Sequence, residues 1–179
     1  MMKAIMAAAI GQLEKRYDYD AAYVRDLLEA SPKALKAFQG VQTLSGFREG
    51  APAAAIAAAG LVATMTEDCG PCVQIGVKIA EENHVPADVL RGILTGDHAL
   101  MGPDASLAFR FARASLDRDL ETADPLRDDV LERWGPKGLA AIALAIASAR
   151  VYPTIKYAMG HGKACSRVDV AGEAVAVRA

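Results

Sequence analysis

Two cysteines three positions apart, Cys69 and Cys72, are the strongest candidates for chemistry in this sequence. They lie in the segment Asp68-Cys69-Gly70-Pro71-Cys72, at the start of a stretch whose apolar pattern predicts a helix to Asn83. The spacing places both sulfurs on one side of a single helical turn, so the pair can close into a disulfide and reopen. The spacing therefore predicts a dithiol that cycles between reduced and oxidised states.

The start of a helix influences how readily a thiol ionises. Unpaired amides there favour the thiolate, typically by about 0.3–1 kcal/mol at exposed sites. Glu67 and Asp68 oppose this effect with negative charge, and burial also disfavours the thiolate, so a local base is needed. Glu67 is the best candidate for that base, acting directly or through water if its pKa is raised. The alternative is that Glu67 is a solvated carboxylate at the helix start.

The composition favours a single helical domain over residues 1–179. Hydrophobic residues make up 53% and aromatic residues only 6%, with abundant alanine, which suits close-packed helices better than sheets. Proline, glycine and capping residues divide the chain into about eight helices. We therefore expect an all-α bundle, with residues 160–179 as a possible extended C-terminal arm.

Start and stop signals place the expected helices along the chain. Residues 53–65 are so uniformly apolar that they should form a buried central helix. Valines alternate with other residues over 168–170 and 175–177, which predicts an extended tail against this chain or a neighbour. The other expected helices cover 1–16, 21–30, a segment from 31, 68–83, 87–94, a segment from 104 or 106 to 116, 124–135 and 139–159, with a loop over 40–52 and a kink or break at Pro153.

The segments around the cysteines resemble a known family. Cys69-Gly70-Pro71-Cys72 also spells the thioredoxin motif, but an alanine-rich helix precedes it where that fold needs a strand. An alanine-rich helix leading into Cys-x-x-Cys, followed by Val-Pro-Ala-Asp-Val-Leu-Arg-Gly-Ile-Leu-Thr-Gly at 85–96, resembles the carboxymuconolactone decarboxylase superfamily. The AhpD-like alkylhydroperoxidase branch is the most similar, over roughly residues 23–159. The resemblance implies an AhpD-like helical bundle.

The resemblance also implies roles for the cysteines. In that branch the pair reduces peroxides, so Cys72 would be the attacking sulfur and Cys69 its resolving partner. Exposure at the first helical turn favours Cys69 instead, so the order stays open. The branch has a histidine four residues after the second cysteine, where this chain has Gly76, and a glutamate where it has Ala57 and Ala58.

The usual proton relay of that branch is therefore absent from this chain, and Glu67, Asp68 and His98 are the candidates to substitute for it. Dithiol exchange needs an accessible thiolate but not that particular relay. We predict a thiol-dependent peroxidase or thiol–disulfide oxidoreductase, with Cys69, Cys72 and Glu67 as catalytic residues and with no organic or metal cofactor.

The predicted partners follow from this chemistry. They are a small-molecule peroxide or disulfide substrate and an external dithiol or protein reductant. The resemblance implies a homo-oligomer, commonly trimeric or hexameric, for which the apolar first helix and the valine-rich tail are candidate contact surfaces.

Two other interpretations remain open. One is a non-enzymatic helical oligomer or ligand-binding protein whose cysteines are vestigial or hold zinc, with His161 and Cys165 as the remaining ligands. Without zinc, Cys165 is a free thiol of the tail. The other is an enzyme resembling carboxymuconolactone decarboxylase itself.

Charge and hydropathy argue against two classes of partner. The formal net charge of −2 and the pI near 5.9 provide no polycation for nucleic acid or an anionic membrane surface. The longest apolar segment, 138–149, is shorter than the roughly 18 residues of a membrane span. Three cysteines are an odd number, which favours a reducing cytoplasm over a disulfide framework.

Overall fold

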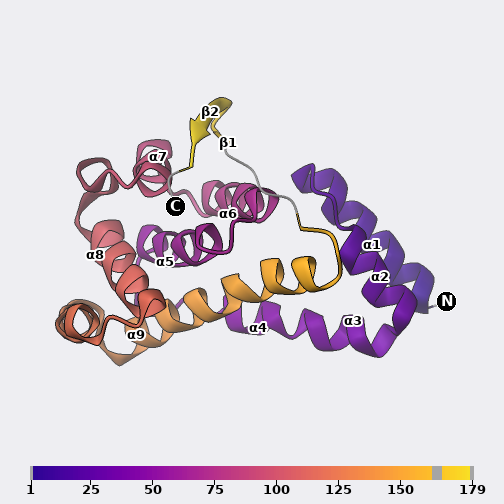
Figure 1. The fold of residues 1–179 in the computed structure, drawn as a ribbon, viewed down its shortest axis with the longest axis horizontal. Coiled ribbons are helices and arrows are strands. Elements are labelled where there is room, and N and C mark those ends of the chain that lie inside the picture. The colour runs from indigo at the N-terminus through magenta and orange to yellow at the C-terminus, as the bar shows by residue number, and fades with distance from the viewer. Residues whose placement is uncertain (1, 163–166, 178–179) are drawn as a thin grey trace.

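The computed structural model describes residues 2–162 and 167–177. Within these ranges the chain is a helical bundle whose strands form a single hairpin, so the predicted all-α class is confirmed (Figure 1). The elements are α1 (Met2–Tyr17), α2 (Ala22–Ala30), α3 (Pro32–Gln39), α4 (Val41–Ser45), α5 (Ala53–Met65), α6 (Gly70–Glu82), α7 (Ala87–Thr95), α8 (His98–Asp117), α9 (Leu120–Ala158), β1 (Arg167–Val170) and β2 (Glu173–Ala176).

Helix α5 lies at the centre of the bundle, with α6, α7, α8 and α9 packed around it (Figure 1). Its alanines Ala55, Ala58 and Ala59 are fully buried, and their short side chains let neighbouring helices approach closely. Leu61 and Val62 fill the remaining space in the same core. The prediction of a buried central helix at 53–65 is confirmed.

The N-terminal helices form a second apolar cluster at one end of the bundle. Ile10, Leu28 and Leu35 are buried in this cluster, and Ile75 of α6 and Ile155 of α9 pack against it. Helices α1 to α3 therefore cover the ends of α6 and α9 where these helices extend beyond the main core (Figure 1).

Polar contacts hold α1 against α6. Glu82 accepts hydrogen bonds from Arg16 at 2.9 Å and from the Tyr17 hydroxyl at 2.9 Å. These bonds, the one from Arg16 first, lower the pKa of Glu82 below its ordinary value. Lys78 donates to the Tyr17 carbonyl at 2.6 Å, which closes the C-terminal end of α1 onto the same helix.

Helices α8 and α9 begin earlier than the sequence analysis predicts. Asp97 caps α8 by accepting from the amides of Ala99 and Leu100, and Asp119 caps α9 by accepting from that of Thr122. Each helix then contains one non-helical glycine, Gly102 or Gly135, directly followed by a proline. Positive φ at these glycines turns the chain, and the proline starts the next helical segment.

Two other expectations about the helices are wrong. Residues 40–52 contain the short helix α4, where a loop was expected. Helix α9 also continues through Pro153 to Ala158 with helical backbone angles, so the proline does not break it. Nearby, the Thr154 hydroxyl donates to the Arg150 carbonyl at 2.6 Å.

The extended tail predicted from the valine pattern is confirmed, and it lies against this chain. Strands β1 and β2 pair antiparallel across a turn at Ala171 and Gly172, both with positive φ. Val168 and Val170 enter the main core. Gln74 of α6 completes the docking because its amide both donates to and accepts from the backbone of Asp169, at 2.9 and 2.7 Å.

By length and composition alone, α9 would fit a membrane-spanning helix, contrary to the expectation that no segment is long enough. In the bundle it packs along α5 and α8, with Ala141 and Ile142 fully buried. Its charged residues Lys137 and Arg150 pair with Glu49 and Glu67. The core helices of soluble proteins can be equally long and apolar, so the length and composition of α9 are weak evidence for a membrane span.

Gly60 of α5 and Gly92 of α7 differ in how closely other atoms approach them. A Cβ at Gly92 would lie 2.8 Å from the Met101 amide and 2.9 Å from the Asp97 carbonyl, whereas a Cβ at Gly60 would meet nothing within 4 Å. We expect Gly92→Ala to reduce the free energy of unfolding by about 1–3 kcal/mol. The matched Gly60→Ala should be neutral or stabilising by up to ~1 kcal/mol, because alanine favours the helix. Equal stability of both variants in urea denaturation would contradict this packing.

Candidate functional site

Cys69 and Cys72 are joined by a disulfide at the start of α6, with their Cα atoms 5.2 Å apart. Cys69 caps the helix: its carbonyl accepts from the amides of Cys72 at 2.9 Å and Val73 at 3.0 Å. The predicted cap, Asp68, lies one residue earlier with φ of +48°. Pro71 falls in the first turn, where its missing N–H leaves no hydrogen bond broken.

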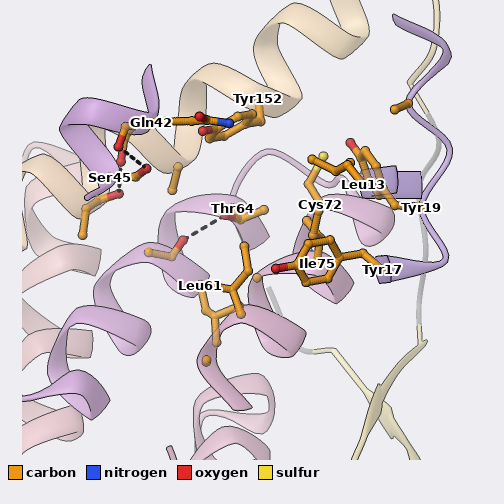
Figure 2. A pocket seen from close by; sticks show the side chains of 18 of the residues that line it. Leu13, Tyr17, Tyr19, Gln42, Ser45, Leu61, Thr64, Cys72, Ile75 and Tyr152 are labelled. Atoms are coloured by element: carbon orange, nitrogen blue, oxygen red, sulfur yellow. Dashed lines mark hydrogen bonds between the residues drawn. The ribbon is translucent and has the colours of Figure 1, made fainter. Parts of the chain in front are cut away.

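The two sulfurs differ in their surroundings. Cys69 is 0% exposed and Cys72 is 4% exposed, so both side chains are buried. Cys72, however, lines a cavity of about 570 Å³, and Cys69 is not among the residues on its wall. The cavity lies between the N-terminal helices and the inner faces of α5, α6 and α9 (Figure 2). A small molecule inside it would meet Cys72 first.

The wall of this cavity is mainly apolar, with a few hydroxyl and amide groups. Figure 2 shows Leu13, Leu61 and Ile75 around the space that Cys72 faces. Among the described residues that line it, the one charged side chain is Arg48, and aspartate, glutamate, lysine and histidine are absent. The polar residues on the wall are Tyr17, Tyr19, Tyr23, Gln39, Gln42, Ser45, Thr64, Asn83, Ser148 and Tyr152.

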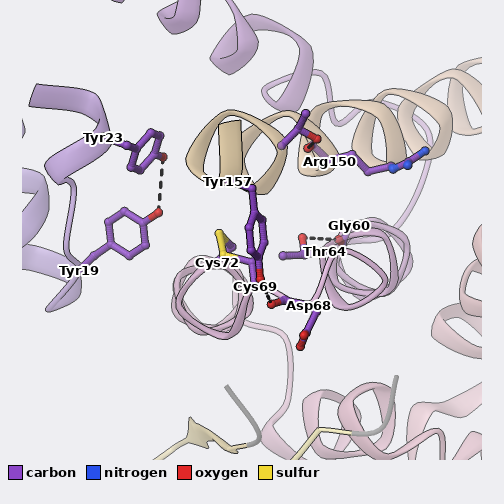
Figure 3. Close-up of a disulfide and its surroundings, with 10 residues drawn as sticks. Tyr19, Tyr23, Gly60, Thr64, Asp68, Cys69, Cys72, Arg150 and Tyr157 are labelled. Atoms are coloured by element: carbon purple, nitrogen blue, oxygen red, sulfur yellow. Dashed lines mark hydrogen bonds between the residues drawn. A yellow bond between two sulfur atoms is a disulfide. The ribbon is translucent and has the colours of Figure 1, made fainter. Parts of the chain in front are cut away.

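The buried Tyr19 and Tyr23 and the half-buried Tyr152 supply hydrogen-bond donors at the cavity. The hydroxyls of Tyr19 and Tyr23 lie 3.4 Å apart and point toward the side on which Cys72 lies (Figure 3). Burial raises the pKa of Tyr19, Tyr23 and Tyr152 above the ordinary value. All three phenols therefore stay protonated at neutral pH and remain able to donate.

Lys156 brings a buried cation to the same tyrosines. Its side chain is 1% exposed, and its Nζ lies 4.6 Å from the centroid of the Tyr19 ring and 5.7 Å from that of Tyr23. Both distances are within the range of a cation–π interaction. The sequence offered no signal for this contact, because α9 and the α1–α2 connection are far apart in the chain.

Glu67, the predicted base, forms an ion pair with Arg150 of α9, with Oε1 and Nε 2.5 Å apart. The guanidinium compensates the negative charge that would otherwise oppose a thiolate at the start of α6. The contact uses one carboxylate oxygen of Glu67, and its role as a base stays a prediction. Arg150 is 83 positions away, and sequence spacing gave no indication of the pair.

Tyr157 fixes the backbone just before the disulfide. Its hydroxyl donates to the Asp68 carbonyl at 2.7 Å, across from α9 to the start of α6 (Figure 3). This bond and the Glu67–Arg150 pair attach two consecutive residues to α9. The segment that leads into Cys69 is therefore held from outside its own helix.

The histidines suggested as alternatives lie in other contacts. His98, expected in a loop, is the first residue of α8; its Nδ1 lies 2.9 Å from the Ser106 hydroxyl and its ring packs edge-on against Phe109. These contacts lie within α8 and do not join His98 to the disulfide. His161 places Nε2 2.7 Å from a carboxylate oxygen of Asp26.

Of the four zinc ligands suggested by the sequence, Cys165 lies outside the described residues. Within residues 2–162 and 167–177, no group of three or more histidine, cysteine, aspartate or glutamate side chains is arranged to hold a metal ion. Cys69 and Cys72 are bonded to each other, and His161 faces Asp26.

Two of the three positions compared above with the proton relay of the resembling branch line the cavity. Gly76 and Ala57 both line the cavity with Cys72, whereas Ala58 is buried in the main core. The places where the resembling branch has a histidine and a glutamate are thus occupied by residues without acid–base chemistry. Tyr19 and Tyr23 are among the polar residues that line the cavity with Cys72, and the sequence pattern gave no signal for them.

The comparisons with known proteins give no match: no protein-family model matches the sequence, and no match is found among curated proteins or solved structures. The family resemblance therefore stays an expectation.

Because Cys72 lines the cavity and Cys69 does not, we expect the two thiols to react at different rates after the disulfide is reduced. We expect Cys69→Ser, which keeps the Cys72 thiol, to react with an apolar maleimide about tenfold faster than Cys72→Ser, a ratio equivalent to a local opening cost of ~1.4 kcal/mol for Cys69. Intact-mass analysis of timed samples measures both rates. Faster labelling of Cys69 would show that the cavity is not the route to the pair.

Proposed function

We propose that this protein is a thiol–disulfide oxidoreductase in which Cys69 and Cys72 cycle between dithiol and disulfide. The observation that carries the proposal is the pairing of the two sulfurs at the start of α6, with Cys72 on the wall of an apolar cavity. A purely structural disulfide gains nothing from facing such a space, whereas a redox pair needs a route for its substrate.

The cycle balances without a bound cofactor. The Cys72 thiolate attacks one sulfur of a disulfide substrate, forming a mixed disulfide and releasing the first substrate thiolate. Cys69 then attacks the Cys72 sulfur, which releases the second substrate thiolate and closes the Cys69–Cys72 bond. The substrate gains two electrons and the cysteines lose two. An external dithiol or protein reductant returns these electrons and restores both thiols.

Local electrostatics support Cys72 as the attacking sulfur. It lies in the first turn of α6, where the helix amides favour negative charge. Arg150 compensates the charge of Glu67 beside the same turn. The cavity wall brings no aspartate or glutamate among its described residues, so no further carboxylate opposes the thiolate from that side.

A peroxide is the second candidate oxidant. Cleavage of its O–O bond by the Cys72 thiolate gives a sulfenic acid and releases an alkoxide, which takes up a proton; Cys69 then displaces water to form the disulfide. The protonated hydroxyls of Tyr19 and Tyr23 favour this alternative, because they can donate to the departing oxygen. Disulfide exchange needs no such donor and is the function that we favour.

The proposal also includes the cellular compartment, the absence of a cofactor requirement and the oligomeric state. A reducing cytoplasm would supply the electrons for the cycle, and no organic or metal cofactor is required. A homo-oligomer would use the exposed apolar side chains of α1, where Met2 and Ile5 are each 66% exposed. The valine-rich tail is a weaker surface for such contacts, because Val168 and Val170 are buried within their own chain.

Oxidation of the reduced protein tests this function. One equivalent of oxidised glutathione should remove two thiols from the wild type, whereas Cys69→Ser should stop at a glutathione mixed disulfide on Cys72. Thiol titration and intact mass measure both outcomes, and Cys165→Ser serves as the control for the third cysteine.

The same samples treated with hydrogen peroxide or an organic hydroperoxide separate the two oxidants. Exchange predicts that the glutathione reaction is the faster one, while a peroxidase would form the disulfide rapidly with peroxide and trap a sulfenic acid in Cys69→Ser. Retention of both thiols with every oxidant would rule out the proposed function.

A further inference from the structure

The cavity beside Cys72 has an unusual charge distribution for this chain. The sequence contains 22 acidic residues and has a net charge of −2, yet none of these acids is among the described residues that line the cavity. Arg48 is the one charged residue on that wall. An anionic group at the mouth would therefore meet the Arg48 guanidinium, with no acidic side chain among the described residues of the wall.

Polar side chains of α4 and of the connection that follows it form one part of the wall. In Figure 2, Gln42 and Ser45 lie on one side of the space, and Cys72 and Leu13 lie on the opposite side. Arg48 follows Ser45 by three positions, in the connection between α4 and α5. Gln42 and Arg48 are exposed, so this part of the wall reaches solvent.

The size of the cavity fits a small organic ligand. Its volume of about 570 Å³ lies within the range of small-molecule sites, which are typically mostly apolar with a few polar groups that fix orientation. Ligand binding would bring apolar surface of both partners out of water, which is the main favourable contribution at such a site.

We propose that this cavity binds a monocarboxylate with a hydrocarbon body, such as a medium-chain fatty acid. The carboxylate lies at the mouth beside Arg48, and the hydrocarbon body extends inward along Leu61 and Ile75 toward Cys72. The bound body covers the Cys72 sulfur and slows access of reductants to the disulfide. Binding itself requires no thiol chemistry, so this inference goes beyond the oxidoreductase function and does not rest on it.

Gly60 allows the cavity to be filled without disturbing its wall. A Cβ at Gly60 meets nothing within 4 Å, and the residue lines the cavity from α5. We expect Gly60→Leu to weaken binding of dodecanoate about tenfold or more, because the new side chain occupies the ligand's space. Gly60→Ala is the smaller matched change, and Ala57→Leu is a second filling variant from the same helix if Gly60→Leu does not fold.

The charge at the mouth is tested with two ligands and two arginine variants. Isothermal titration calorimetry, below the critical micelle concentration, should show dodecanoate binding more tightly than dodecanol. Arg48→Gln should weaken the acid by about two- to fivefold, the range for an exposed ion pair, and leave the alcohol unchanged. Arg110→Gln, an exposed arginine of α8 that does not line the cavity, should change neither.

The rate at which the disulfide is reduced tests whether the ligand lies next to Cys72. Saturating dodecanoate should slow reduction of the wild-type disulfide by dithiothreitol, and Gly60→Leu should abolish that protection. Binding should persist in Cys69→Ser/Cys72→Ser, so failure of the redox cycle and failure of this inference are distinguishable. Absence of dodecanoate binding, or binding that Gly60→Leu and Ala57→Leu leave intact, would overturn the cavity as the site. Equal binding of acid and alcohol would overturn the anionic ligand class.

Discussion

The first turn of α6 is held between two apolar cores, and the proposed chemistry depends on this placement. On one side the turn packs against α5 in the main core; on the other it faces the cluster formed by α1 to α3. Burial protects both sulfurs from bulk solvent, while incomplete filling between the cores leaves a cavity at Cys72. One sulfur thus has an internal route and the other is enclosed by protein.

Contacts from distant parts of the chain adjust the charge and position of this turn. Arg150 and Tyr157 of α9 hold Glu67 and the Asp68 carbonyl, which fixes the backbone leading into Cys69. Lys156, between them in sequence, is buried against the rings of Tyr19 and Tyr23. A single stretch of α9 therefore contacts both the approach to the disulfide and the tyrosines of the cavity.

Local sequence rules were sufficient for several parts of the fold. The alanine-rich pattern placed α5 at the centre, and the cysteine spacing placed a dithiol at the start of α6. The alternating valines predicted the extended tail, because period-two burial depends only on neighbouring positions. The starts of α8 and α9 also have local signals in Asp97 and Asp119, but the acids and prolines later in each segment give the same kind of signal.

The cavity and its electrostatics could not be predicted in the same way. They arise where α1 to α3 meet α5, α6 and α9, and the pairing of Glu67 with Arg150 joins residues 83 positions apart. Periodicity identifies which face of a helix is apolar but not whether two apolar faces fill the space between them. For that reason the sequence names both cysteines as candidates, whereas the cavity beside Cys72 is seen only in the packing.

The most direct test of the central claim is a redox titration of the folded protein in dithiothreitol buffers, with the cysteine state measured by alkylation and mass spectrometry. A reversible transition of the Cys69–Cys72 pair at a potential above about −300 mV, with helical circular dichroism unchanged, is the result that the account predicts. A disulfide that is reduced only when the protein unfolds would be a structural cross-link and would contradict it.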